Sequence, residues 1–182
     1  MSKRGAILLC CLVLLPACRG KDKGPDIGAL IADLKGADEE KKGKATLTLI
    51  RVGEPAVPAL IEMLKSEDPR HRAMAATTCF GMGAKARAAA PALAEALADP
   101  EHEVRVGAAM AIESIGPEAA VAVPALIKAL KDKDGLVRQR AAIALGAIGP
   151  AAEEAVTALI EASRWDPVRP AAEEALQRIK SR

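Results

Sequence analysis

The chain has 182 residues, a formal net charge of +2 and a hydrophobic fraction of 51%, yet it contains no Tyr and only one Trp and one Phe. So few aromatic side chains argue against a surface that stacks nucleic-acid bases and against an aromatic-lined pocket for a small ligand. Charges of both signs are nearly balanced, and no basic stripe indicates a phosphate backbone as partner. We therefore expect one modest domain behind a leader, with no nucleic-acid partner.

The leader, residues 1–17, is typical of an export signal. Lys3 and Arg4 give it a positive start, and the apolar stretch 6–15 is too short to span a bilayer as a mature helix. The sequence Leu-Pro-Ala-Cys that ends at Cys18 resembles the lipobox of bacterial lipoproteins. This resemblance implies that the Cys18 thiol receives a diacylglycerol and that the signal is cut just before it. The alternatives are an ordinary secretory signal or a disulfide role for this cysteine.

A lipidated Cys18 would place the chain at the bacterial cell envelope. Two or more acyl chains hold a protein on a membrane almost permanently, since each buried methylene contributes about 0.8 kcal/mol. In the lipoprotein family an aspartate after the cysteine favours the inner membrane, so Arg19 favours the outer membrane, facing the periplasm. Residues 18–26 then comprise the lipidated cysteine and a charged, flexible tether that extends to about 27 Å.

From residue 27 onward the sequence repeats itself. The tetrapeptide Val-Pro-Ala-Leu at 123–126 recurs in similar form every 33 residues, and an earlier copy, 27–53, aligns on 57–83 at an offset of 30. A period in this range is typical of a solenoid, in which each unit contacts mainly its neighbours. The repeat domain, 27–182, thus holds five copies, which begin near residues 27, 57, 90, 123 and 156.

The fourth copy shows most clearly what one unit contains. Apolar residues spaced i, i+3, i+4 and i+7 between Val123 and Leu130 predict a one-faced helix. Residues 131–135 predict a turn, and a second apolar stripe over 137–148 ends at Gly149, a common helix stop. Each unit is therefore expected to be a pair of short antiparallel helices, which can bury their apolar faces only by stacking.

The turn sequence Asp-Gly-Leu-Val-Arg at 134–138, followed by Ala-Ala at 141–142 and Ile-Gly at 148–149, resembles the HEAT repeat. HEAT repeats usually run to about 40 residues or more, and the closer resemblance is to the short HEAT-like type first associated with phycobilin lyases. Ankyrin and tetratricopeptide repeats have a similar period, but their Thr-Pro-Leu-His turn and aromatic pattern are missing. The resemblance implies an all-α fold, an α-α superhelix of about five two-helix repeats.

Four arginines recur near the starts of successive second helices: Arg72, Arg105, Arg138 and Arg169. In the HEAT family, acids and arginines around this turn commonly tie neighbouring repeats together, and we expect that structural role here. Binding of an anion or a partner is the alternative. The first copy lacks this arginine, which fits a terminal unit whose outer face meets water.

The resemblance also implies that the second helices line a concave face along which partners commonly lie. Positions that differ between copies are the candidates for specificity there. They are Met74, Gly107 and Arg140 in one set and Phe80, Glu113 and Gly146 in the other. The alternative for each is a filler of the interface between repeats.

No catalytic or metal site stands out in the sequence. His71 and His102 are out of step with the repeat and lack a clustered third ligand, so we expect no metal. Cys79 takes a position that is apolar in neighbouring copies, which predicts an inert core cysteine. In the absence of a triad order or a glycine-rich phosphate loop, we expect no cofactor and no enzymatic activity.

These patterns lead to one hypothesis and two rivals. The hypothesis is a lipid-anchored, non-catalytic scaffold or adaptor that binds an unidentified protein partner at the cell envelope. The first rival is a structural or assembly factor of an envelope complex, which self-associates through the solenoid. The second, a lyase-like or enzyme-accessory role, rests on the family resemblance alone.

Overall fold

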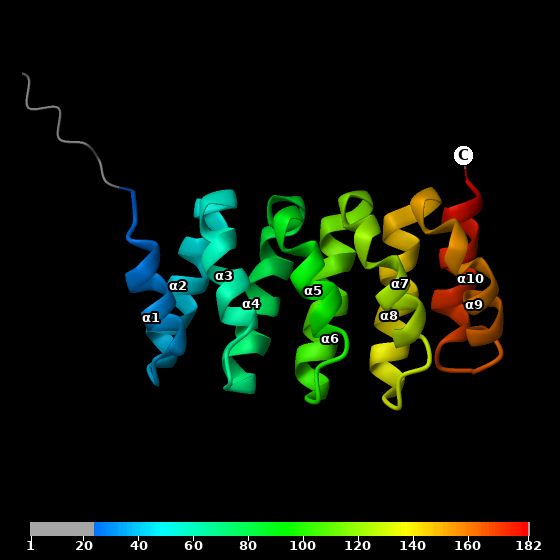
Figure 1. The fold of residues 1–182 in the computed structure, drawn as a ribbon, viewed down its shortest axis with the longest axis horizontal. Helices are drawn as coiled ribbons and strands as arrows, with labels where there is room; N and C mark the ends of the chain where they lie inside the picture. Colours follow the sequence, from blue (N-terminus) through cyan, green and yellow to red (C-terminus); the bar gives the residue numbers. More distant parts are fainter. Residues whose placement is uncertain (1–23, 182) are drawn as a thin grey trace, which may run out of the picture.

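The computed structural model describes residues 24–181, and all regular secondary structure in that range is helical (Figure 1). Ten α-helices form five successive pairs that stand side by side in one row. The pairs are α1 (Ile27–Lys35) with α2 (Glu39–Val52), α3 (Val57–Leu64) with α4 (Pro69–Met82), α5 (Ala90–Ala96) with α6 (His102–Ile115), α7 (Val123–Ala129) with α8 (Gly135–Ile148), and α9 (Val156–Ala162) with α10 (Arg169–Lys180). The predicted all-α solenoid of two-helix repeats is confirmed.

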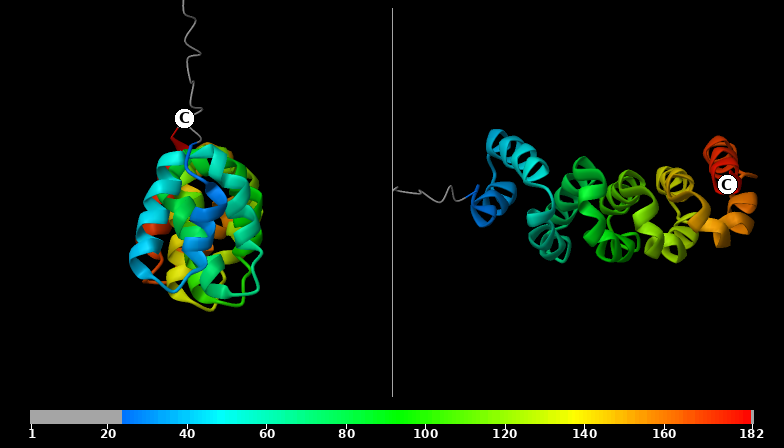
Figure 2. Two further views of the ribbon diagram at one scale, coloured as in Figure 1. Left: turned by 90° about the vertical axis from the view of Figure 1, so that its left-hand side faces the viewer. Right: turned by 90° about the horizontal axis from the view of Figure 1, so that it is seen from above.

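The helices lie in two layers, the first helix of each pair in one layer and the second helix in the other (Figure 2, right). Second helices pack closely because small residues face their neighbours. A Cβ added to Gly107 would lie 3.1 Å from the Cβ of Ala76, and one added to Gly146 would lie 2.9 Å from the Cα of Ala175. Gly107 and Gly146, which the sequence offers as variable surface positions, are buried between repeats. Their lack of a side chain sets how near the helices come.

Glycine ends four of the second helices, as the repeat predicts. These glycines adopt φ between 58° and 76°, a backbone region that side chains disfavour. They are Gly53, Gly83, Gly116 and Gly149. Beyond these glycines, 3₁₀ helices lead into the next pair: η1 (Glu54–Ala56), η2 (Gly83–Ala89), η3 (Gly116–Ala122) and η4 (Gly149–Ala155).

The longer 3₁₀ helices bury alanines three residues apart, which matches their three residues per turn. These fully buried pairs are Ala86 and Ala89, Ala119 and Ala122, and Ala152 and Ala155. The connection between repeats is therefore a third packed element of the unit rather than a surface loop. The sequence carried this signal as an alanine spacing of three.

Two further features recur from repeat to repeat: an aspartate that caps the second helix and a buried leucine in the first helix. Asp38, Asp68 and Asp134 each accept hydrogen bonds from backbone N–H groups at the start of a second helix. Asp134 makes Gly135, expected within the turn, the first residue of α8. The core has one fully buried leucine at the same place in the first helix of copies two to five: Leu60, Leu93, Leu126 and Leu159.

Two helical stretches, His102–Ala129 and Gly135–Ala162, are long and apolar enough to cross a bilayer by length and composition alone. Each joins a second helix, a 3₁₀ helix and the next first helix, and each turns at a glycine of positive φ. In each, 44% of the apolar window is buried within the solenoid. Core helices pass the same test, so the finding is weak evidence for a membrane span. The predicted signal 1–17, Cys18 and the first part of the tether lie outside the described residues.

Candidate functional site

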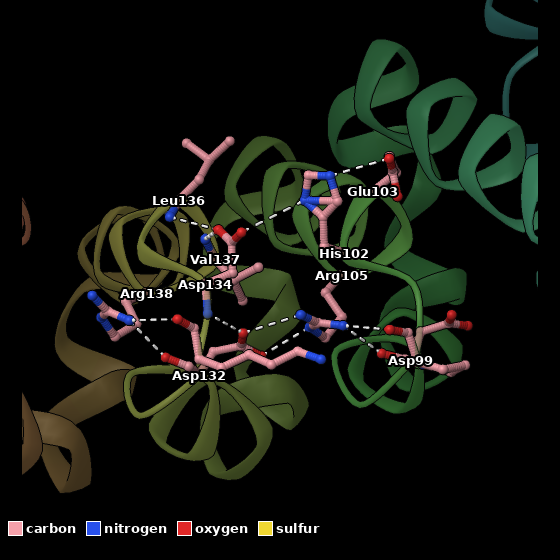
Figure 3. A network of polar contacts seen from close by, with 11 residues as sticks. Asp99, His102, Glu103, Arg105, Asp132, Asp134, Leu136, Val137 and Arg138 are labelled. Carbon is pink, nitrogen blue, oxygen red and sulfur yellow. Dashed lines mark hydrogen bonds and ion pairs between the residues drawn. The ribbon is translucent and has the colours of Figure 1, made fainter.

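The recurring arginines contact the turn of the following repeat. Arg72 on α4 donates from Nε and Nη2 to the two carboxylate oxygens of Asp99, at 2.6 and 2.9 Å. Arg105 on α6 meets Asp132 in the same manner, with Nε 2.8 Å from Oδ2 and Nη2 donating to Oδ1 at 3.1 Å (Figure 3). Planar guanidinium and carboxylate groups fit one another well in this two-point geometry. Each contact joins consecutive repeats.

Each of these arginines also holds the turn of its own repeat. Arg72 donates from Nη1 to the carbonyl oxygens of Ser66 and Glu67. Arg105 donates in the same way to the carbonyls of Asp99 and Pro100 (Figure 3). Protein groups therefore take up most of the donors of these two guanidinium groups, and Arg105 is only 4% exposed. Such groups can hold repeats together but offer little to an outside ligand.

The last two members of the series differ from the first two. The Arg138 guanidinium lies 4.9 Å from the centroid of the Trp165 ring, a cation–π contact that replaces the ion pair. Arg169 instead pairs with Asp166 of its own turn, Nη2 to Oδ1, at 2.8 Å. The sequence groups Arg169 with the other three, but its contacts do not join repeats.

Sequence reasoning named the arginines and missed their partners. Residues 66, 99, 132 and 165 occupy one position of the repeat and are Ser, Asp, Asp and Trp. The 33-residue step of Asp99 and Asp132 was a usable signal, but it became meaningful only when the packing brought that position beneath the arginine of the preceding repeat.

Electrostatics at Asp99 favour its charged form. Partial burial alone would raise the pKa of Asp99, but hydrogen bonds from Arg72 and from the Glu101 N–H, with the positive charges of Arg72 and Arg105, outweigh it and lower the pKa. The hydrogen bond to Asp99 in turn raises the pKa of Arg72. The pair is ionised at neutral pH and depends on staying so.

Within the described residues, His71, His102 and Cys79 take part in no assembled chemical site. His102 lies 3.1 Å from Glu103 and 3.7 Å from Asp134 through its two ring nitrogens (Figure 3). Within residues 24–181, no cluster of three or more His, Cys, Asp or Glu side chains is placed to hold a metal. Cys79 is fully buried, and burial raises its pKa to about 12, which leaves almost no thiolate at neutral pH.

The candidate interaction surface is the outer side of the second helices, here called the second-helix face. One residue per helix forms its central row: Leu47, Thr77, Met110, Ile143 and Glu174. Leu47 is 70% exposed, Thr77 and Glu174 are exposed, and Met110 and Ile143 are half-buried. Apolar side chains thus occupy three of the five positions of this row. This row was not predicted from the sequence, although its first four members follow the step between copies.

The four predicted specificity residues lie on the same face. Met74 is half-buried and Phe80 is 39% exposed, both on α4. Glu113 on α6 and Arg140 on α8 are half-buried and form a pair across repeats, with Nη1 3.6 Å from Oε2. Beyond this pair, a shallow pocket of about 150 Å³ between α8 and α10 is lined in part by Ile143. The face therefore offers apolar side chains bordered by charges of both signs.

Comparisons with known proteins agree with this architecture. The family model of HEAT repeats matches residues 27–103 and 90–177. No curated protein matches the sequence. Among solved structures, the complex of CpcE and CpcF of phycocyanin lyase from Nostoc sp. PCC7120 is similar with a TM-score of 0.70 at 22% identity, over 82% of this chain and 96% of that one.

Two further solved structures are similar. A designed armadillo repeat protein in complex with the peptide (KR)4 has a TM-score of 0.65 at 19% identity, over 85% of this chain and 82% of its own. An engineered protein has a TM-score of 0.56 at 25% identity, over 85% of this chain and 79% of its own. At such identities these likenesses bear on the fold.

Proposed function

This chain belongs to the HEAT-repeat family, and on that premise we propose that it is a non-catalytic scaffold that binds a protein partner along its second-helix face. We propose further that Cys18 carries a lipid that holds the scaffold at the bacterial cell envelope, at the outer membrane on its periplasmic side. The two statements rest on different residues, and they are tested separately.

One observation carries the binding proposal. The second-helix face carries apolar side chains in register in three of the five repeats, and these are at least partly exposed, whereas Arg72 and Arg105 at the turns contact mainly other groups of the protein. Exposed apolar side chains that recur in a row mark interaction surfaces more often than isolated ones do. Two similar structures support the idea at the level of fold, because one is a complex of CpcE with CpcF and the other holds a peptide.

Photo-crosslinking in intact cells tests the binding proposal. A photoreactive amino acid replaces Phe80 or Arg140 on the second-helix face, and Glu62, exposed on α3 in the other layer, is the matched control. We expect a discrete protein adduct from Phe80 and Arg140 and none from Glu62. An equal adduct pattern at all three positions, or none, would refute the proposal, and an adduct between two copies of the chain would favour the assembly-factor rival.

The lipid anchor has its own test. Intact mass and membrane partition of the native chain are compared with those of a Cys18→Ser variant. We expect the native chain to carry an acyl mass increment and to sediment with membranes, and the variant to lose both. An unmodified, soluble native chain would overturn the envelope location and leave the binding proposal standing.

A further inference from the structure

We infer that the first repeat is a movable cap: α1 and α2 undock from the second repeat as one unit while the second to fifth repeats stay folded. Three observations carry this inference. They are the contacts that are missing between the first two repeats, the pocket that lies there, and the small number of side chains that the first repeat buries.

The junction of the first and second repeats differs from the later ones in its polar contacts. An arginine–aspartate pair joins the second repeat to the third and another joins the third to the fourth, and a cation–π contact joins the fourth to the fifth. Among residues 24–181, no ion pair or side-chain hydrogen bond joins the first repeat to the second. The ion pairs of α2 lie within that helix, Lys42 with Glu39 at 2.6 Å and Lys44 with Glu40 at 2.5 Å.

Substitutions at three positions of the repeat account for this difference. Lys42 stands where the later repeats have the recurring arginine, and Ser66 stands where the third and fourth repeats have the aspartate. His71 takes the place of a valine that is fully buried in the third, fourth and fifth repeats. Its Nδ1 lies 3.3 Å from Oγ of Ser66, within the turn of the second repeat. The first two changes remove the charged contact, and the third puts a polar ring at a core position.

A pocket of about 380 Å³ lies at the same junction. Gly36 and Ala37 line it from the turn of the first repeat. They are the counterparts of Ser66 and Glu67, whose carbonyl oxygens accept hydrogen bonds from Arg72 in the second repeat. The pocket therefore coincides with the place where the arginine contacts are missing.

The first repeat also buries few side chains. Leu34 is the buried residue of α1, and Ala45 and Leu49 are those of α2, whereas α6 of the third repeat buries eight residues. The contact between α2 and α4 is apolar: Cδ1 of Ile50 lies 2.5 Å from the place of a Cβ on Gly81. Isolated helices of this length are marginal in water. We therefore expect α1 and α2 to lose their backbone protection together when they undock.

The fifth repeat, at the other end of the row, is held more firmly (Figure 1). Its second helix, α10, buries Ala171, Ala172, Ala175 and Ile179, and Trp165 contacts the fourth repeat through the cation–π interaction. An end position alone therefore does not explain the loose junction. Opening is expected at the first repeat and not at the fifth.

Undocking uncovers the edge of α4. Met74, one of the predicted specificity residues, lines the pocket, and Ile50 covers Gly81. Both positions on α4 become accessible when α1 and α2 move away. The first repeat thereby controls access to one end of the second-helix face.

Native-state hydrogen exchange tests the inference on the full chain carrying Cys18→Ser, read by mass spectrometry at several low urea concentrations. We expect the amides of α1 and α2 to share one opening free energy, with protection at least about tenfold lower than in α10. Helix α10 is the matched control, because it is the second helix of the repeat at the other end. Equal protection in α2 and α10 would refute the inference. Protection that falls gradually along α2 toward α1 would refute a cap that moves as one unit.

Variants test the cause of the opening. Lys42→Arg combined with Ser66→Asp restores the charged contact and should slow exchange in α1 and α2 about tenfold, since hydrogen bonds between charged groups are strong. Each single change should have a smaller effect, and exchange in α8 should not change. Ile50→Ala removes apolar contact with α4 and should speed exchange in α1 and α2 alone.

Protection of α6 and α8 in the same samples shows that the remaining repeats stay folded. Unchanged exchange of α1 and α2 in the double variant would overturn the inference. Exchange that Ile50→Ala speeds equally in α2 and α6 would overturn it as well, because the first repeat would then open only with the whole solenoid.

Discussion

Removing the guanidinium of Arg105 should destabilise the solenoid at the junction of its third and fourth repeats. In the Arg105→Ala variant, Asp132 loses its ion pair, and the carbonyl oxygens of Asp99 and Pro100 lose their shared donor. The side chains of Arg105 and Asp132 are only 5% and 13% exposed, so water replaces these contacts poorly. The ion pair and the hydrogen bonds are therefore lost at a junction that is almost fully shielded from water.

Breaking one partner of a buried ion pair typically costs about 3–5 kcal/mol, because the remaining charge stays buried. Asp132 keeps one hydrogen bond, from the N–H of Asp134. We therefore expect the free energy of unfolding to fall by about 3 kcal/mol, near the lower end of that range. Arg169→Ala is the matched control at the same repeat position, since that pair is half exposed or more on both sides. Exposed pairs contribute about 0.2–1 kcal/mol.

Urea unfolding followed by circular dichroism measures both variants, with fluorescence of the single Trp165 as a probe of the fifth repeat. The double variant Arg105→Ala with Asp132→Asn should be less destabilised than the sum of the single changes, since it leaves no unpaired charge. Equal losses for Arg105→Ala and Arg169→Ala would refute the reasoning. A loss below about 1 kcal/mol for the buried residue would do so as well.

Burial and charge support three other predictions. Gly146→Ala should lower the urea midpoint, because its Cβ would lie 2.9 Å from a backbone atom of α10, whereas Gly43→Ala, in open space within α2, should raise stability by about 0.5–1 kcal/mol. The pKa of Asp99 is lower in the folded chain than in the unfolded chain, so this carboxylate stabilises the fold at pH values above its unfolded pKa. The stabilisation is lost as the pH falls through the pKa that Asp99 has in the folded chain. Asp99→Asn should therefore make stability depend less on pH in the acid range. Cys79 should react with a thiol reagent only after denaturant is added, and rapid labelling of the native chain would contradict its burial.

Much of the fold was predictable because the same local sequence signals recur in each copy of a tandem repeat. The glycine that ends each helix, the proline that begins most first helices and the buried leucine all recur at a fixed step. Each is a local requirement of backbone geometry or of one apolar stripe. The 3₁₀ connections were missed because alanines three apart do not break a helical pattern.

The interaction surface could be predicted only in part. Met74, Phe80, Glu113 and Arg140 were chosen because they vary between copies, and they lie on the second-helix face. Gly107 and Gly146 vary too, but they are buried where neighbouring helices touch. Variation alone cannot separate a surface residue from an interface residue, because both escape the constraint of the common core. The rotation of each helix against its neighbours decides between them.

By itself, the sequence determined the number of repeats, the two-helix unit and the arginine that recurs in its turn. The two-helix unit and its arginine are contained within one 33-residue period, and the recurrence of that period gives the number of repeats. Only the tertiary structure decided that Arg72 and Arg105 reach forward to the aspartates of the next repeat, and that Leu47 lies on the same face as apolar residues of the third and fourth repeats. Those relations depend on how far one unit shifts and turns upon the next. That geometry is set by side-chain packing between units, and no single period contains it.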